Sequence, residues 1–170
     1  MANGSDAEYL AYVHGRATGL RRTAYLLCGD EHQADDLVQE TITKLYTRWS
    51  RISGVENVDA YVHTMLVRTF LDEKRRGWWK VRLGVPLDRP APAPPPHGVE
   101  ERAVLRAALS QVPPGQQAVL VLRFLCDQPV ADVARMLGRS EGTVKSQTAH
   151  GLTALRRILG DRIRSLGGTR

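Results

Sequence analysis

The side chains best placed for recognition chemistry follow a tight turn near residue 139. The segment 130–155 reads VADVARMLGRSEGTVKSQTAHGLTAL, which is a helical pattern, a three-residue turn and a second helical pattern. Gly138 suits a backbone position of positive φ, Ser140 suits a helix N-cap, and Val144 points back toward a core. This spacing predicts a helix-turn-helix, whose second helix enters the major groove of DNA. A plain helical hairpin with a glycine turn is the alternative.

The outer face of this second helix carries groups that can bond to phosphates and to base edges. We take its candidates for contact with duplex DNA to be Arg139, Ser140, Glu141, Thr143, Lys145, Ser146, Gln147 and His150.

A second group of cations is interleaved with aromatic side chains. Lysine or arginine occupies positions 68, 74, 75, 76, 80 and 82, and Phe70, Trp78 and Trp79 lie among them. Cations can hold a phosphate backbone while aromatic rings stack on unpaired bases, so this mixture favours single-stranded nucleic acid. Core packing of Trp78 and Trp79 is the alternative.

An acidic helix face is formed by Asp35, Asp36, Gln39 and Glu40. Phosphates repel such a face, so it favours a basic protein surface over DNA, with a merely solvated face as the alternative. His32 lies four and eight residues before Asp36 and Glu40, which is a spacing that could hold a metal ion. No further ligand is suggested nearby, and we therefore expect no metal.

Charge changes sign along the 170 residues, whose net charge is +6. Residues 1–40 carry a net −4, residues 41–100 a net +4 and residues 101–170 a net +6. Chance variation between solvated helix faces is the simple explanation. The alternative is that the acidic residues 1–40 bind a protein partner and that the two basic ranges bind a polyanion.

A proline-rich stretch divides the chain, because six of the eleven residues from 86 to 96 are proline. Proline disfavours helix interiors and sheets, so we expect an extended linker that spans about 45 Å. The predicted organisation is a helical domain at 1–83, a linker at 84–99, a helix-turn-helix domain at 100–164 and a tail at 165–170. Strand patterns are absent, so the predicted fold class is all-α.

The apolar periodicity and turn signals place the helices. Asp30 and Asn57 suit N-caps, and residues 50–56 read as a loop. The expected helices cover 9–27, 31–49, 58 onward, 104–112, 116–125, 130–137 and 141 to about 159.

Several classes of protein are disfavoured. No apolar run is long enough to cross a membrane, the first residues lack a secretory pattern, and the two cysteines suit a reducing compartment. Phosphate-binding and catalytic motifs are absent. We therefore expect a cytoplasmic protein that is not an enzyme and has no cofactor, no small-molecule substrate and no membrane contact.

Three stretches together resemble the extracytoplasmic-function (ECF) group of sigma-70 factors, the promoter-recognition subunits of bacterial RNA polymerase. They are ADDLVQETITKLY at 34–46, AYVHTMLVRTFLDEKRR at 60–76 and LGRSEGTVKSQTAHGLTALR at 137–156. They are similar to the family's polymerase-binding helix, to its −10 element helix and to its −35 recognition helix, in the family's order.

The resemblance implies that Asp35, Asp36, Gln39 and Glu40 dock on the β′ clamp helices of core RNA polymerase, and that the β flap is a further contact. It assigns the melted −10 element to the following residues: Arg51, Ser53, Asn57, Tyr61, Arg68, Thr69, Asp72, Arg75 and Arg76. Such a protein would bind promoter DNA in duplex and melted form, melt it and initiate transcription. Members of this group are commonly held inactive by an anti-sigma factor, so the resemblance also implies such a partner.

Three positions depart from the pattern. The family often has asparagine at the position of Arg68, and many members have arginine at those of Gln147 and His150. Gln147 could pair with adenine in the major groove, or simply lose a phosphate contact. The alternative function is a free-standing helix-turn-helix regulator with a helical sensing or dimerisation domain.

Overall fold

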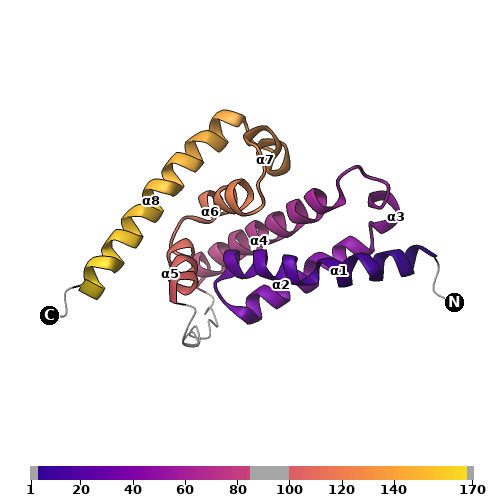
Figure 1. Cartoon of the computed structure of the whole chain (residues 1–170), viewed down its shortest axis with the longest axis horizontal. Helices are drawn as coiled ribbons and strands as arrows, with labels where there is room; N and C mark the ends of the chain where they lie inside the picture. The colour runs from indigo at the N-terminus through magenta and orange to yellow at the C-terminus, as the bar shows by residue number, and fades with distance from the viewer. Residues whose placement is uncertain (1–3, 85–99, 168–170) are drawn as a thin grey trace.

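A computed structural model describes residues 4–84 and 100–167 of the chain. All regular secondary structure in these two ranges is helical, which confirms the all-α prediction. The helices form two groups that lie against each other (Figure 1).

The first group contains three long helices and one single turn. α1 spans Gly4–Cys28, α2 spans Glu31–Tyr46 and α4 spans Val58–Arg82, with the short α3 at Trp49–Ile52. α1 packs along α2, and both contact α4. α1 also holds the first turn of α4, because the Tyr12 hydroxyl donates to Asp59 Oδ1 (2.7 Å) and Arg16 pairs with Asp59 Oδ2 (2.9 Å).

The second group contains shorter helices and one long final helix. α5 spans Glu100–Leu109, α6 spans Pro114–Leu120, and a π-helical turn covers Val121–Leu125. α7 (Val130–Leu137) and α8 (Glu141–Gly167) follow. α8 contacts α5, α6 and α7, and its C-terminal end extends away from the rest of the molecule (Figure 1).

The predicted caps are confirmed. Asp30 Oδ1 accepts from the Gln33 amide (2.9 Å), and Asn57 Oδ1 accepts from the Ala60 amide (2.9 Å). Each bond satisfies a backbone donor that has no partner within its helix. Pro114 stands in the first turn of α6, where its missing N–H costs nothing.

Several boundaries differ from the sequence expectation. The expected helix at 31–49 ends at Tyr46. The short α3 begins at Trp49 and extends into the expected loop at 50–56, because Trp49 and Ile52 are buried and anchor one helical turn. α1 begins at Gly4 rather than Tyr9, and α8 continues to Gly167. The expected helix at 116–125 starts at Pro114 and ends in the π-helical turn.

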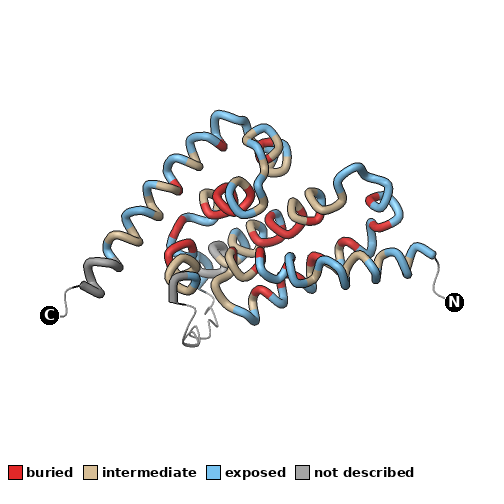
Figure 2. The backbone as a smooth tube through the Cα atoms, in the orientation of Figure 1, coloured by how far each residue is buried: buried red, intermediate tan, exposed pale blue. Residues whose placement is uncertain are grey.

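One apolar core joins the two groups of helices. It includes Leu66 and Phe70 of α4 together with Val119, Leu122 and Val133 of the second group. The buried parts of α4 and α6 lie side by side (Figure 2). A smaller cluster around Leu109 fixes α5 and α8.

Gln117 is the polar group at the centre of this contact. It is only 2% exposed, and its Nε2 donates to the carbonyls of Leu26 (3.1 Å) and Leu27 (2.8 Å). These carbonyls belong to the last turn of α1, where a helix leaves its acceptors unpaired. A side chain of α6 therefore caps α1. Nearby, the Arg106 guanidinium lies 4.1 Å from the centre of the Tyr25 ring.

Replacing Gln117 by leucine should lower the midpoint of thermal unfolding by about 3–10 °C, because two acceptors lose their donor at a buried contact. Circular dichroism melting of the full chain measures this shift. The matched control is Gln111→Leu, since Gln111 is exposed and bonds only within its own segment. Equal melting of the two variants would show that the Gln117 bonds contribute no net stability.

Candidate nucleic-acid interfaces and protein-docking face

The helix-turn-helix has a rigid turn. Gly138 adopts φ 62° and ψ 40°, the left-handed conformation that glycine accepts without strain. The Arg139 amide donates to the Ala134 carbonyl (2.9 Å) and the Gly138 amide to the Arg135 carbonyl (3.3 Å). These two bonds form a Schellman motif, which closes α7. The sequence expectation for this turn is confirmed.

α8 begins as the sequence predicts. The Ser140 hydroxyl accepts from the Thr143 amide (3.1 Å) and lies 2.9 Å from the Thr143 hydroxyl. Val144 is fully buried, which turns the opposite face of α8 toward solvent. Six of the eight candidates for duplex contact are exposed: Ser140, Glu141, Thr143, Lys145, Ser146 and His150.

Arg139 and Gln147 differ from these six residues, because both are half-buried and bonded to each other. Arg139 NH1 donates to Gln147 Oε1 at 2.6 Å. The sequence placed both on one recognition face but gave no sign that they are partners.

The candidates for the −10 element lie on α3, on the loop after it and along α4. Most are exposed: Arg51, Ser53, Asn57, Tyr61, Arg68, Asp72, Arg75 and Arg76. Thr69 lies below this surface, because it is 2% exposed and its hydroxyl accepts from Lys44 Nζ (3.2 Å). The side chains of Trp78 and Trp79 fall outside the described side chains, so the question of base contact or core packing stays open for both.

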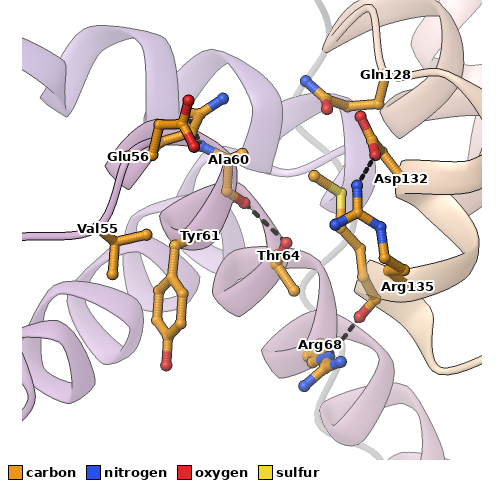
Figure 3. A pocket seen from close by; sticks show the side chains of 11 residues that line it. Val55, Glu56, Ala60, Tyr61, Thr64, Arg68, Gln128, Asp132 and Arg135 are labelled. Carbon is orange, nitrogen blue, oxygen red and sulfur yellow. Dashed lines mark hydrogen bonds and ion pairs between the residues drawn. The ribbon is translucent and has the colours of Figure 1, made fainter. Parts of the chain in front are cut away.

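Three of these residues line a cavity of about 700 Å³ between α4 and α7. Asn57, Tyr61 and Arg68 border it on the first group, and Asp132 and Arg135 border it on α7, where they form an ion pair (Figure 3). Arg68 closes one end, since its Nε donates to the Met136 carbonyl at 2.6 Å. The helix-turn-helix thus stands over part of the predicted −10 surface.

A smaller hollow of about 220 Å³ lies on the other side of Arg68. Four −10 candidates line it, namely Tyr61, Arg68, Thr69 and Asp72, and two cations from elsewhere in the chain join them: Lys44 and Arg48. The sequence analysis missed Lys44 and Arg48. Their positions on α2 and beside α3 reach α4 only through tertiary packing.

Two of the four residues on the acidic face of α2 form ion pairs within the protein, and the other two bond to no cation among the described residues. Asp36 and Gln39 are exposed. Asp35 is engaged by Arg21, with Nε 2.7 Å from Oδ1 and NH2 3.4 Å from Oδ2. Glu40 pairs with Lys44 Nζ (2.7 Å).

Glu40 also has a carboxyl partner on α4. Glu73 hydrogen-bonds to Glu40, and burial, that bond and the negative charge of Glu40 raise the pKa of Glu73 to about 7. The hydrogen bond from Lys44 lowers the pKa of Glu40. Two carboxyl groups so close cannot both ionise without repulsion, so Glu73 keeps the proton and Glu40 the charge.

The rival metal site receives no geometric support. Among the residues the structure describes, no three histidine, cysteine, aspartate or glutamate side chains gather in a way that could hold an ion. Burial raises the pKa of the Cys28 thiol to about 12, which keeps it in the unreactive protonated form. Within the same residues, no helix combines the length and the apolarity needed to cross a bilayer.

Over the described residues the secondary structure is helical, and the second group of helices contains a helix-turn-helix. This motif is typical of DNA-binding transcription proteins. The family model described as "Sigma-70 region 2" matches residues 13–80, and the one described as "Sigma-70, region 4" matches residues 102–155. The chain belongs to the sigma-70 family of RNA polymerase sigma factors, within its ECF group.

Relatives named as sigma factors are similar to this chain along most of its length. The RNA polymerase sigma-E factor of Streptomyces avermitilis is 34% identical over 95% of this chain and 90% of its own length. The ECF RNA polymerase sigma factor SigM of Mycobacterium tuberculosis is 32% identical over 83% of this chain and 71% of its own length.

Solved structures share the fold. The sigma factor RpoE of Bartonella quintana, in complex with the anti-sigma factor NepR, has a TM-score of 0.74 at 23% identity and covers 90% of this chain and 97% of its own. CnrH, in complex with the cytosolic domain of CnrY, has a TM-score of 0.65 at 18% identity and covers 93% and 91%.

The chain is therefore a sigma factor that directs RNA polymerase to promoters, and members of this family are regulatory proteins. A free-standing helix-turn-helix regulator is not favoured. The resemblance deduced from the three sequence stretches is confirmed.

Stability should fall as the pH rises through the titration of Glu73. Its pKa is raised in the folded chain, so its contribution is complete below about pH 4.5 and is lost as the pH passes about 7. Glu73→Gln mimics the protonated form. Its melting temperature relative to the wild type should therefore rise between pH 5 and pH 8.

Thermal melting at several pH values checks this difference, with Glu56→Gln as the control, because Glu56 is exposed. A difference between Glu73→Gln and the wild type that stays constant with pH would contradict the shared proton.

Proposed function

We propose that the two halves of the chain divide the promoter between them. The α4 surface, with the loop before it, binds the melted −10 element, and the N-terminal part of α8 reads the −35 element as duplex. The observation that supports this most directly is the hollow on α4, where Lys44, Arg48 and Arg68 line a space together with Tyr61.

The α4 hollow suits an unpaired base. Its volume of about 220 Å³ exceeds that of one base, and Lys44, Arg48 and Arg68 place positive charge beside it for the neighbouring phosphates. Arg51, Ser53 and Asn57 extend this surface on one side of the hollow, along the path of the single DNA strand. Arg75 and Arg76 extend it along α4. Thr69 acts from the floor of the hollow, where it also orients Lys44.

The −35 duplex lies against α8. Glu141, Thr143, Lys145 and Ser146 project from its exposed first two turns, the part of a recognition helix that reaches base edges. His150 stands one turn further and adds a contact to the rim.

The acidic face of α2 docks on core RNA polymerase. Asp36 and Gln39 supply its exposed centre, while Asp35 and Glu40 are held by Arg21 and Lys44 at its edges. The β′ clamp helices are the proposed partner of this face, and the β flap is the proposed partner of the helix-turn-helix half. The chain has no catalytic activity of its own and works in the cytoplasm.

Simultaneous binding of both elements requires the two halves to separate. Elements centred about 25 base pairs apart lie about 85 Å apart along straight DNA. Arg68 and Met136, one from each half, are hydrogen-bonded at 2.6 Å. The proline-rich sequence between the halves supplies the reach, since its extended length is about 45 Å.

The Gln117→Leu variant checks this separation. It weakens the contact between the halves, so it should increase the radius of gyration of the free chain in small-angle scattering without loss of helix. An unchanged radius would contradict the idea that this contact limits opening.

An anti-sigma factor is the proposed regulator, since the two similar structures were solved as complexes, one with the anti-sigma factor NepR and the other with the cytosolic domain of CnrY. A partner that stabilises the packed arrangement would keep Arg68 on Met136 and away from DNA.

Run-off transcription with core RNA polymerase tests the proposed function. Genomic fragments should give discrete transcripts only when this chain is added, because core polymerase alone does not select promoters. The absence of any chain-dependent transcript from the whole fragment set would refute the proposal.

Reversing the charges of the α2 face should abolish binding to core polymerase. The double variant Asp36→Lys and Glu40→Lys places two cations against a basic partner, and we expect a loss of affinity of at least tenfold in co-purification and interferometry. Glu8→Lys, an exposed reversal on α1, is the control and should bind normally. Retained binding by a folded double variant would place the docking face elsewhere.

A further inference from the structure

Arg139 is bonded to both helices of the helix-turn-helix. Its backbone amide closes the Schellman motif on Ala134 (2.9 Å), and the residue after it caps α8. The backbone of Arg139 is therefore tied to both flanking helices.

Gln147 fixes the side chain of Arg139 as well. The 2.6 Å bond joins the guanidinium NH1 to the amide oxygen of Gln147, two turns along α8. A guanidinium only donates, so the oxygen rather than the nitrogen of the Gln147 amide must face it. Both side chains are half-buried, whereas Lys145 and Ser146 between them are exposed.

α6 supports this pair from behind. A Cβ atom added at Gly115 would lie 3.4 Å from Arg139 NH1, 3.4 Å from Gln147 Nε2 and 3.5 Å from Arg139 NH2. The first turn of α6 therefore lies against the two side chains, and a methyl group at position 115 would meet them at ordinary van der Waals distance.

This geometry is unfavourable for base reading by Gln147. Recognition of adenine needs both amide atoms in one plane directed into the groove. Here the oxygen is bound to Arg139 and the nitrogen lies against α6.

We propose that Gln147 is a positioning residue that holds Arg139 for contact with a backbone phosphate of the −35 duplex. Arg139 stands in the turn that precedes the recognition helix, beside the N-terminus of α8, and both features favour a phosphate. Gln147 then affects promoter strength through Arg139 and does not select a base. This inference rests on the proposed reading of the −35 element by α8.

A double-mutant cycle on the full chain tests this role. The probe is a promoter fragment recovered by run-off transcription, with the −35 region randomised, bound by core polymerase plus each variant at several salt concentrations. Arg139→Met should weaken binding about tenfold on all sequences and reduce the slope of log affinity against log salt by about 0.9, the signature of one lost phosphate contact.

Gln147→Met should weaken binding about threefold, also evenly across sequences, and should have no further effect when Arg139 is already methionine. Gln111→Met is the matched control and should bind like the wild type, with circular dichroism confirming the fold of every variant.

Two results would overturn the proposal. One is a loss of discrimination at a single A·T base pair in Gln147→Met, which would make Gln147 a base reader. The other is an additive loss of about thirtyfold in the double variant. Failure of the proposed function is distinct, because then the wild-type chain itself would give no promoter-dependent transcript.

Discussion

The two groups of helices share one apolar core, and the rest of the structure depends on that contact. α4 and α6 bury their faces against each other, and Gln117 satisfies the open end of α1 at the centre. The buried Gln117 amide on α6 finds both of its acceptors on α1, so these bonds form in only one arrangement of the two halves. The same contact lays α7 over Arg68, so the stability of the packed chain and access to the −10 surface are opposed.

Charge supports this division of labour at close range. Two acids of α2 are paired: Asp35 binds Arg21 in an exposed ion pair, and Glu40 binds Lys44. The exposed acids of α2 are Glu31, Asp35 and Asp36, and Gln39 is exposed as well. The α4 hollow is lined by three cations, Lys44, Arg48 and Arg68, and by one acid, Asp72. The surface proposed for the −10 element is therefore more positive than the α2 face proposed for core polymerase.

The sequence alone predicted the features that depend on neighbours within one or two turns. The caps at Asp30, Asn57 and Ser140, the left-handed Gly138 and the buried Val144 follow from local geometry. α3 escaped prediction, because one turn of helix forms there only where Trp49 and Ile52 find a core. The three stretches that resemble sigma-70 factors also indicated the family correctly.

Only the tertiary structure decided which polar side chains meet. Nothing in the local sequence indicates that Gln117 is buried, because the two carbonyls that it binds lie about 90 positions earlier in the chain. Lys44 and Arg48 join the α4 hollow, Thr69 sinks below it, and Gln147 turns from the groove toward Arg139. Sequence periodicity determines which face of a helix is polar. Only the packing of distant helices determines which of those polar groups remain available to a partner.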